Sequence, residues 1–118
     1  MKKRLIRIGF FSELKYGRAT DPSLKGSVQP AADPEDAKFV SYLRLGKQMA
    51  MAPGVSRDVI DNSIIGGMAI LTDGTYSWPS DLAHYIERHH VRPPEELVAH
   101  ARSNDFAMPS FDTSLLEL

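Results

Sequence analysis

The dipeptide Asp73-Gly74 lies between two short runs of strand-forming residues and predicts a tight β-hairpin. The runs cover residues 68–72 and 75–78. Asp-Gly is a preferred pair for a two-residue type I′ turn, because both central residues of that turn need a positive φ angle. Pro79-Ser80 follows at once and predicts that the second strand leads into a helix. We expect the rest of the chain to be organised around this hairpin.

An N-terminal strand is predicted over residues 4–11, where Ile6, Ile8 and Phe10 alternate with less apolar positions and so define a buried face. A hairpin alone is only marginally stable, so we expect this strand to pair with it. The predicted fold is α+β, with a small antiparallel sheet made of the N-terminal strand and the Asp-Gly hairpin, covered by about three to four helices.

The first helix is predicted to begin at Asp33, an N-cap residue, with Pro34 at the first helical position. Apolar residues at helical spacing extend this helix to about Ala52, before Pro53-Gly54. A short second helix is predicted over residues 57–61, with Val59 and Ile60 turned inward.

Two further helices follow the hairpin. The first begins after Ser80 as N-cap and carries a stripe of Leu82, Tyr85, Ile86 and His89. The second begins at Pro94, buries Leu97, Val98 and Ala101, and ends near Asn104.

The length of 118 residues predicts a single domain over residues 1–118, in which residues 107–118 dock as a C-terminal arm. Residues 16–32 are rich in turn formers and predict a long surface loop, which is a candidate for contact with a partner. In the fold, Trp78 is expected to be a core anchor beneath the first helix.

Charge and cysteine content exclude several classes of function. The net charge of −1 argues against nucleic acid as the main partner, and the absence of Cys excludes disulfides and thiolate zinc sites. No window is long and apolar enough to cross a membrane. Arg7, Glu13 and Lys15 interrupt the apolar run that a signal peptide needs, so a cytoplasmic protein is expected.

The four histidines do not have the spacing of a metal site. His84 and His89 are five positions apart, whereas ligands on one helix meet at i and i+3 or i+4, and His90 points to another side. His100 and Glu96 have an allowed spacing that is common by chance. No nucleophile elbow, phosphate loop or His-Glu-x-x-His motif occurs, so we expect no catalytic residues, no metal and no cofactor.

The acidic residues are the distributed feature that best fits partner binding. Caps and solvated faces account for several of them, and a surface that steers a basic protein partner is the functional alternative. Tyr76 on the second hairpin strand belongs to this surface if its side of the sheet is open. The candidate partner-binding residues are Asp33, Glu35, Asp36, Asp58, Asp61, Asp73, Tyr76 and Asp81.

The motif formed by Thr72-Asp73-Gly74, Trp78-Pro79, Leu82-Ala83 and Tyr85 resembles one found in a group of small bacterial proteins. The later Glu95-Glu96 to His100 segment and residues 7–11 are similar as well, so the resemblance covers about half of the chain. Many proteins of this group look like immunity proteins encoded beside secreted polymorphic toxins. The motif residues are explained as turn, core and cap, so the resemblance transfers a fold and no catalytic residue.

The resemblance implies a non-catalytic protein that binds a cognate protein toxin and blocks its active or functional surface. Two alternatives remain open. One is a small cytoplasmic hydrolase or modification-reversing enzyme that uses His84, His100 and a neighbouring acid. The other is a nucleic-acid-linked adaptor that uses basic residues near the first strand, namely Arg4, Arg7, Lys15 and Arg18.

Overall fold

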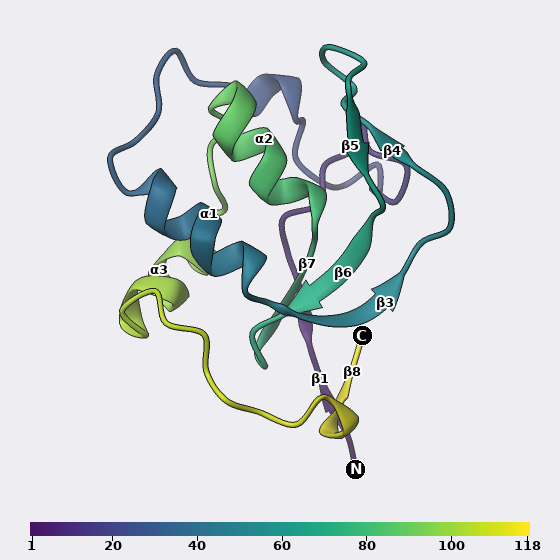
Figure 1. Ribbon diagram of the computed structural model, residues 1–118, viewed down its shortest axis with the longest axis vertical. Helices are drawn as coiled ribbons and strands as arrows, with labels where there is room; N and C mark the ends of the chain where they lie inside the picture. The colour runs from purple at the N-terminus through teal and green to yellow at the C-terminus, as the bar shows by residue number, and fades with distance from the viewer.

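Three helices lie together beside a small sheet in the computed structural model, which describes all residues, 1–118 (Figure 1). The helices are α1 (Asp36–Arg44), α2 (Asp81–His89) and α3 (Glu95–Ser103). The strands are β1 (Lys3–Arg4), β2 (Ile6–Arg7), β3 (Lys47–Met51), β4 (Ser56–Arg57), β5 (Ile64–Gly66), β6 (Ala69–Thr72), β7 (Tyr76–Pro79) and β8 (Leu116–Glu117). Two 3₁₀ turns cover Lys25–Ser27 and Thr113–Leu115. The predicted α+β class is confirmed.

The main sheet has the order β2-β7-β6-β3 and is mixed. β2 runs parallel to β7, while β6 runs antiparallel to both of its neighbours, β7 and β3. The prediction of a purely antiparallel sheet was therefore wrong, because the N-terminal segment enters beside β7 in the same direction. The segment is also split at the buried Leu5, and Ile6 is 47% exposed, so Ile6 does not belong to a buried face.

The hairpin between β6 and β7 is present, but its turn is not the two-residue type I′ turn. Gly74 has a φ of 94°, whereas Asp73 is not among the residues of positive φ. The Asp73 carboxylate instead accepts hydrogen bonds from the N–H groups of Thr75 at 3.0 Å and Tyr76 at 2.9 Å. Since the Asp side chain satisfies these donors itself, the turn widens, and Thr72 pairs with Ser77.

The first helix is shorter than predicted and gives way to a strand. α1 ends at Arg44, and the next segment forms β3, which pairs antiparallel with β6. Gly46 explains the change, because a Cβ there would lie 2.8 Å from Trp78 Cζ2 and 3.0 Å from Leu71 Cβ. The chain crosses closely over Trp78 at this glycine and then joins the sheet.

The predicted short helix over residues 57–61 was also wrong. Ser56 and Arg57 form β4, which pairs with β5 in a separate two-stranded hairpin that lies at the upper right of Figure 1. Val59 and Ile60 lie in its turn and are exposed rather than inward. Asp58 holds this turn with its own carboxylate, which makes a helix unnecessary for satisfying the local N–H groups.

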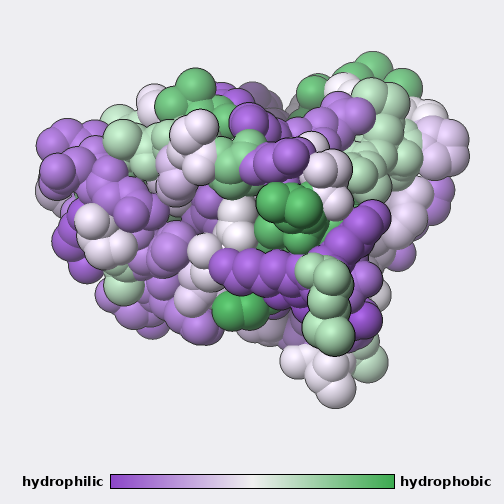
Figure 2. All heavy atoms as spheres, turned by 90° about the horizontal axis from the view of Figure 1, so that it is seen from below, coloured by the Kyte–Doolittle hydropathy of each residue, from purple (hydrophilic) through white to green (hydrophobic).

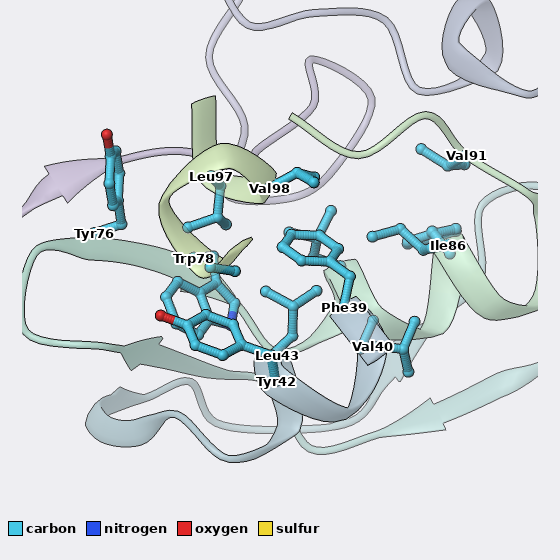
Figure 3. Packing of buried hydrophobic residues seen from close by; sticks show 14 of the residues in the cluster. Phe39, Val40, Tyr42, Leu43, Tyr76, Trp78, Ile86, Val91, Leu97 and Val98 are labelled. Atoms are coloured by element: carbon cyan, nitrogen blue, oxygen red, sulfur yellow. The ribbon is translucent and has the colours of Figure 1, made fainter. Parts of the chain in front are cut away.

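Trp78 lies at the centre of the core, fully buried, with its ring stacked on Tyr42 of α1 at a centroid distance of 6.2 Å (Figure 3). The prediction for Trp78 is confirmed. The predicted inward faces of α2 and α3 are also confirmed, since Leu82, Tyr85, Ile86, Leu97, Val98 and Ala101 are all buried. Ser80 precedes α2, but its hydroxyl accepts a hydrogen bond from the N–H of Ala69 and does not cap the helix.

The two long irregular segments are attached to this core. In the segment 16–32, Leu24 is fully buried and Val28 forms a β-bridge with Val91. At the other end of the chain, β8 pairs in parallel with β1, and Leu116 is buried. Neither segment lies free of the domain.

Candidate functional site

A carboxylate and two imidazoles converge between the β4–β5 turn and α2. His84 Nε2 lies 2.7 Å and His89 Nε2 lies 2.6 Å from the same oxygen, Oδ2 of Asp58. We call Asp58, His84 and His89 the histidine–aspartate cluster. Their ligand atoms all lie within 4.8 Å of one another. A single buried carboxylate therefore joins a surface turn to two points on one helix.

The turn residues fix the Asp58 carboxylate from the opposite side. Oδ1 accepts hydrogen bonds from the N–H groups of Ile60 at 2.7 Å and Asp61 at 3.1 Å. The Tyr85 hydroxyl accepts a hydrogen bond from the N–H of Val59 at 3.0 Å, and this bond connects the same turn to α2. Both Asp58 oxygens consequently have assigned partners, one on the backbone and one on the histidines.

The five-residue spacing of His84 and His89 was expected to keep them from sharing a partner, but the structure brings both to Asp58. The two rings lie 6.3 Å apart between centroids, and each also contacts the Tyr85 ring. Side chains five positions apart on a helix are separated by more than one turn. Both can still contact a third side chain that packs against the helix between them. The partner is supplied by Asp58 from the distant β4–β5 turn.

The electrostatics of the cluster favour an ionised Asp58. Burial alone would raise its pKa, but hydrogen bonds from His84, the turn N–H groups and His89 outweigh this effect and hold the pKa below its ordinary value. The edges of the histidines remain open, with side-chain exposures of 21% for His84 and 16% for His89. The carboxylate of the cluster is therefore buried, while its two imidazole rings are partly accessible to solvent.

Asp61 adds a second carboxylate at the rim of the cluster. Its Oδ2 lies 3.5 Å from His89 Nε2 and forms an ion pair with Arg88 at 2.5 Å. The Ser63 hydroxyl and N–H, together with Arg88, hold the pKa of Asp61 well below its usual range.

Asp81 and Ser56 lie next to the cluster and line a pocket of about 130 Å³. The Ser56 hydroxyl donates to Asp81 Oδ2 at 2.5 Å, whereas the buried Oδ1 of Asp81 has no hydrogen-bond partner. Burial raises the pKa of Asp81. The pocket wall combines apolar side chains with two cations, and its lining includes Phe10, Leu14, Val55, Met68, Lys15 and Arg57.

Large apolar side chains are exposed around this pocket and along the β4–β5 hairpin. We call this set the apolar hairpin surface; its members are Met51, Val55, Val59, Ile60 and Ile64, between 38% and 69% exposed. Seen from below, hydrophilic side chains cover most of the helical side of the molecule, while hydrophobic ones form separate patches, among them one at the centre and one at the upper right (Figure 2). A monomeric domain rarely exposes so many large apolar residues within one short stretch of chain, here residues 51–64, without a role in binding.

A second cluster lies beneath the β6–β7 turn. Tyr42 donates to Asp73 Oδ2 at 2.5 Å, and His100 Nε2 lies 3.4 Å from the same oxygen. Tyr76 contacts the His100 ring and donates to Glu96 at 2.9 Å. His84 and His100 therefore belong to two different carboxylates, and the structure does not bring them together in one site.

Burial removes most of the predicted partner-binding residues from the outer surface. Asp36, Asp58, Asp73, Tyr76 and Asp81 are each at most 7% exposed. Their side chains instead bond to turns, hydroxyls and histidines within the fold, as described for Asp58, Asp73 and Asp81 above. They do not form a continuous acidic face that could steer a basic protein.

The other three candidates are accessible but already have partners. Asp33 and Asp36 cap the start of α1 reciprocally: Asp33 Oδ1 accepts from the N–H of Glu35 at 2.9 Å, and Asp36 Oδ2 accepts from the N–H of Asp33 at 3.0 Å. Glu35 binds Arg102 of α3 through both oxygens. Asp61 binds Arg88.

Arg7, the basic residue of β2, is not free to bind a phosphate group. Arg7 binds Asp21 at 2.8 and 2.9 Å, and its guanidinium lies 3.9 Å from the centroid of the Phe10 ring. Asp21 also accepts the N–H of Arg18. Neutralisation of Arg7 by Asp21 weakens the case for a nucleic-acid adaptor.

Sequence patterns missed both the histidine–aspartate cluster and the apolar hairpin surface. The apolar residues between positions 51 and 64 follow no helical or strand period, and Val59 and Ile60 fitted a short inward-facing helix equally well. An apolar content that is high for so turn-rich a stretch was the available signal.

No family model matches the chain, and neither the curated proteins nor the solved structures gave a significant match. None of the helices combines the length and apolar character needed to cross a lipid bilayer.

Proposed function

We propose that this protein is a non-catalytic immunity protein that binds a cognate bacterial toxin in the cytoplasm and covers the toxin's active or functional surface. The observation that carries the proposal is the apolar hairpin surface, in which five large side chains are exposed within residues 51–64, three of them on the β4–β5 hairpin and its turn. The sequence resemblance to immunity proteins supplies the class of partner. The three helices and the main sheet act as a scaffold for this surface.

The pocket beside the hairpin supports a protein partner with an apolar anchor. Its apolar wall suits an aromatic or aliphatic side chain, because binding energy in protein interfaces concentrates on such anchors in desolvated pockets. Lys15 and Arg57 on the same wall favour an acidic group beside that anchor. The proposed contact surface thus differs from the acidic residues expected from the sequence.

The hairpin is well supported for this role. Asp58 joins its turn to α2 through His84 and His89, and Arg88 joins Asp61 to the same helix. A surface held in place in this way loses little conformational entropy on binding, which favours tight association.

Co-expression with the product of the neighbouring open reading frame tests the proposal. We expect the wild-type chain to protect the host in a stoichiometric complex, and Ile64→Asp and Val55→Asp to abolish protection. Leu115→Asp is the matched control, because Leu115 is 62% exposed and Ile64 is 63% exposed, but Leu115 lies near the C-terminal strand. A harmless neighbour, or toxicity that persists while both proteins are folded, would reject the idea.

A small hydrolase or modification-reversing enzyme is the second candidate. Its support is the hydrogen bond between His84 and the buried Asp58, next to the pocket that Ser56 and Asp81 line. A carboxylate that orients a histidine is a common arrangement in general base catalysis. This candidate requires protection at amounts far below those of the toxin, lost in His84→Ala and retained in Ile64→Asp.

A further inference from the structure

We propose that Asp58, His84 and His89 form a binding site for one divalent transition-metal ion, with Zn²⁺ as the best-matched ion. The inference concerns a metal bound by the chain alone and does not depend on the proposed toxin partner.

The donor set fits zinc. Two imidazole nitrogens and one carboxylate oxygen are ligands that Zn²⁺ prefers, and three protein ligands leave a fourth position for water. Both histidines present Nε2 to the same point, and Asp58 presents Oδ2 to them. Hard cations such as Mg²⁺ and Ca²⁺ prefer oxygen ligands, so this set disfavours them.

The two distances between histidine Nε2 and Asp58 Oδ2 need a modest increase to fit zinc. Zinc bonds of roughly 2.0–2.2 Å in a tetrahedron place neighbouring ligand atoms about 3.3–3.5 Å apart. The present Nε2 to Oδ2 distances are 2.7 Å and 2.6 Å, so each histidine must retreat slightly from Asp58. The histidines are the partners able to move, because their edges are open while the Asp58 side chain is completely buried.

The surroundings already orient the carboxylate ligand. Oδ1 of Asp58 is held by the N–H groups of Ile60 and Asp61, which leaves Oδ2 directed at the histidines. Hydrogen bonds to the non-ligating atoms of a metal ligand fix its orientation and strengthen the site. The backbone of the β4–β5 turn supplies this support here.

The charges that face the cluster also favour a cation. Asp61 Oδ2 lies 3.5 Å from His89 Nε2, and Asp81, whose buried Oδ1 lacks a partner, lies three positions before His84 on α2. Arg88 is the opposing cation, and its guanidinium is bound to Asp61. The Tyr85 ring packs against both histidines.

Isothermal titration of the full-length protein with ZnCl₂ tests the proposal. We expect one ion per chain, with the dissociation constant raised at least tenfold in His84→Gln and in His89→Gln. His100→Gln is the matched control, because His100 also lies beside a buried aspartate, Asp73, but outside the cluster. Unchanged affinity in both cluster variants, or the absence of binding by the wild-type chain, would overturn the proposal.

A measurement on the wild-type protein guards against variants that fail to fold. Side-chain nitrogen NMR spectra should show Zn²⁺ shifting the Nε2 resonances of His84 and His89 while those of His90 and His100 stay in place. Shifts confined to His90 or His100, or shared equally by all four histidines, would show binding elsewhere on the surface and reject the assigned site.

Discussion

Tyr42 on α1 donates its hydroxyl hydrogen to Asp73 in the β6–β7 turn, with 2.5 Å between the two oxygens. Both side chains are buried, and the bond joins residues 31 positions apart in the sequence. Burial is the largest cause that raises the pKa of Tyr42 well above its ordinary value, and the hydrogen bond to Asp73 is the second. This bond links the helical side of the domain to the turn of its central hairpin.

Tyr42→Phe should lower the free energy of unfolding by about 1–3 kcal/mol, because it leaves a buried carboxylate oxygen short of a donor. The Phe ring can keep the stacking on Trp78, which separates the hydrogen bond from the packing. Urea denaturation measures the effect. Tyr16→Phe is the control at an exposed position and should change the free energy by less than about 0.5 kcal/mol. Equal stability of the two variants would contradict a role for the bond.

Gly46→Ala should destabilise the protein by about 1–3 kcal/mol, because the added methyl group would overpack the contact with Trp78 and Leu71. Gly67→Ala is the matched control, since a Cβ at Gly67 meets no atom within 4 Å and its φ is not positive. There the expected change is neutral to slightly stabilising. Thermal unfolding followed by circular dichroism distinguishes the two, and a neutral Gly46→Ala would refute the close crossing over Trp78.

Glu13 should make the stability of the protein depend on pH in the acid range. Its carboxylate accepts hydrogen bonds from the N–H groups of Leu24 at 2.6 Å and Lys25 at 2.9 Å. Burial opposes ionisation, but these bonds and one from the Ser23 hydroxyl prevail and lower the pKa of Glu13 from 4.5 to about 2.

The folded-state pKa of Glu13 lies below the unfolded-state value, so its contribution is present above pH 4.5 and is lost as the pH falls through about 2. Glu13→Gln should cost about 1–2 kcal/mol at pH 7, after allowance for solvent screening, and the difference from wild type should shrink between about pH 5 and pH 2. Denaturation at several pH values measures this. Glu117→Gln, at an exposed position, should show no such narrowing.

Leu116→Ala should lower the free energy of unfolding by about 2–4 kcal/mol, because it removes buried apolar groups that hold the C-terminal strand to the domain. Leu116 is 7% exposed, whereas its neighbour Leu115 is 62% exposed and gives the control Leu115→Ala. Hydrogen exchange at the N–H of Leu5, which bonds to the carbonyl of Glu117, reports the same attachment locally. Similar effects of the two substitutions would show that the strand is not bound as described.

Local patterns predicted the parts of the fold that neighbouring residues determine. The stripe of α2, the inward face of α3 and the burial of Trp78 follow from spacing and residue type alone. The switch from α1 to β3 could not be predicted in this way, because the reason for it is the ring of Trp78 lying against Gly46, more than 30 positions later.

The candidate site was inaccessible to sequence reasoning for a similar cause. The positions of His84 and His89 on one helix do not match a ligand pair, and only the distant Asp58 makes them neighbours. For the acidic residues, the sequence suggested a site that the structure does not form. Their number suggested a charged surface, but Asp36, Asp73 and Asp81 form hydrogen bonds inside the fold. Whether an aspartate caps a turn or faces a partner depends on contacts that are distant in sequence.

The parallel pairing of β1 with β8 places Lys3 beside Leu116 and Arg4 beside Glu117. This pair lies at the bottom of Figure 1, whereas β4 and β5 lie at the top. A tag, a fluorophore or an immobilising linker attached at either end should therefore leave the apolar hairpin surface free. Surface-coupled binding assays can be built in both orientations, and agreement between them would itself indicate that the partner binds away from the termini.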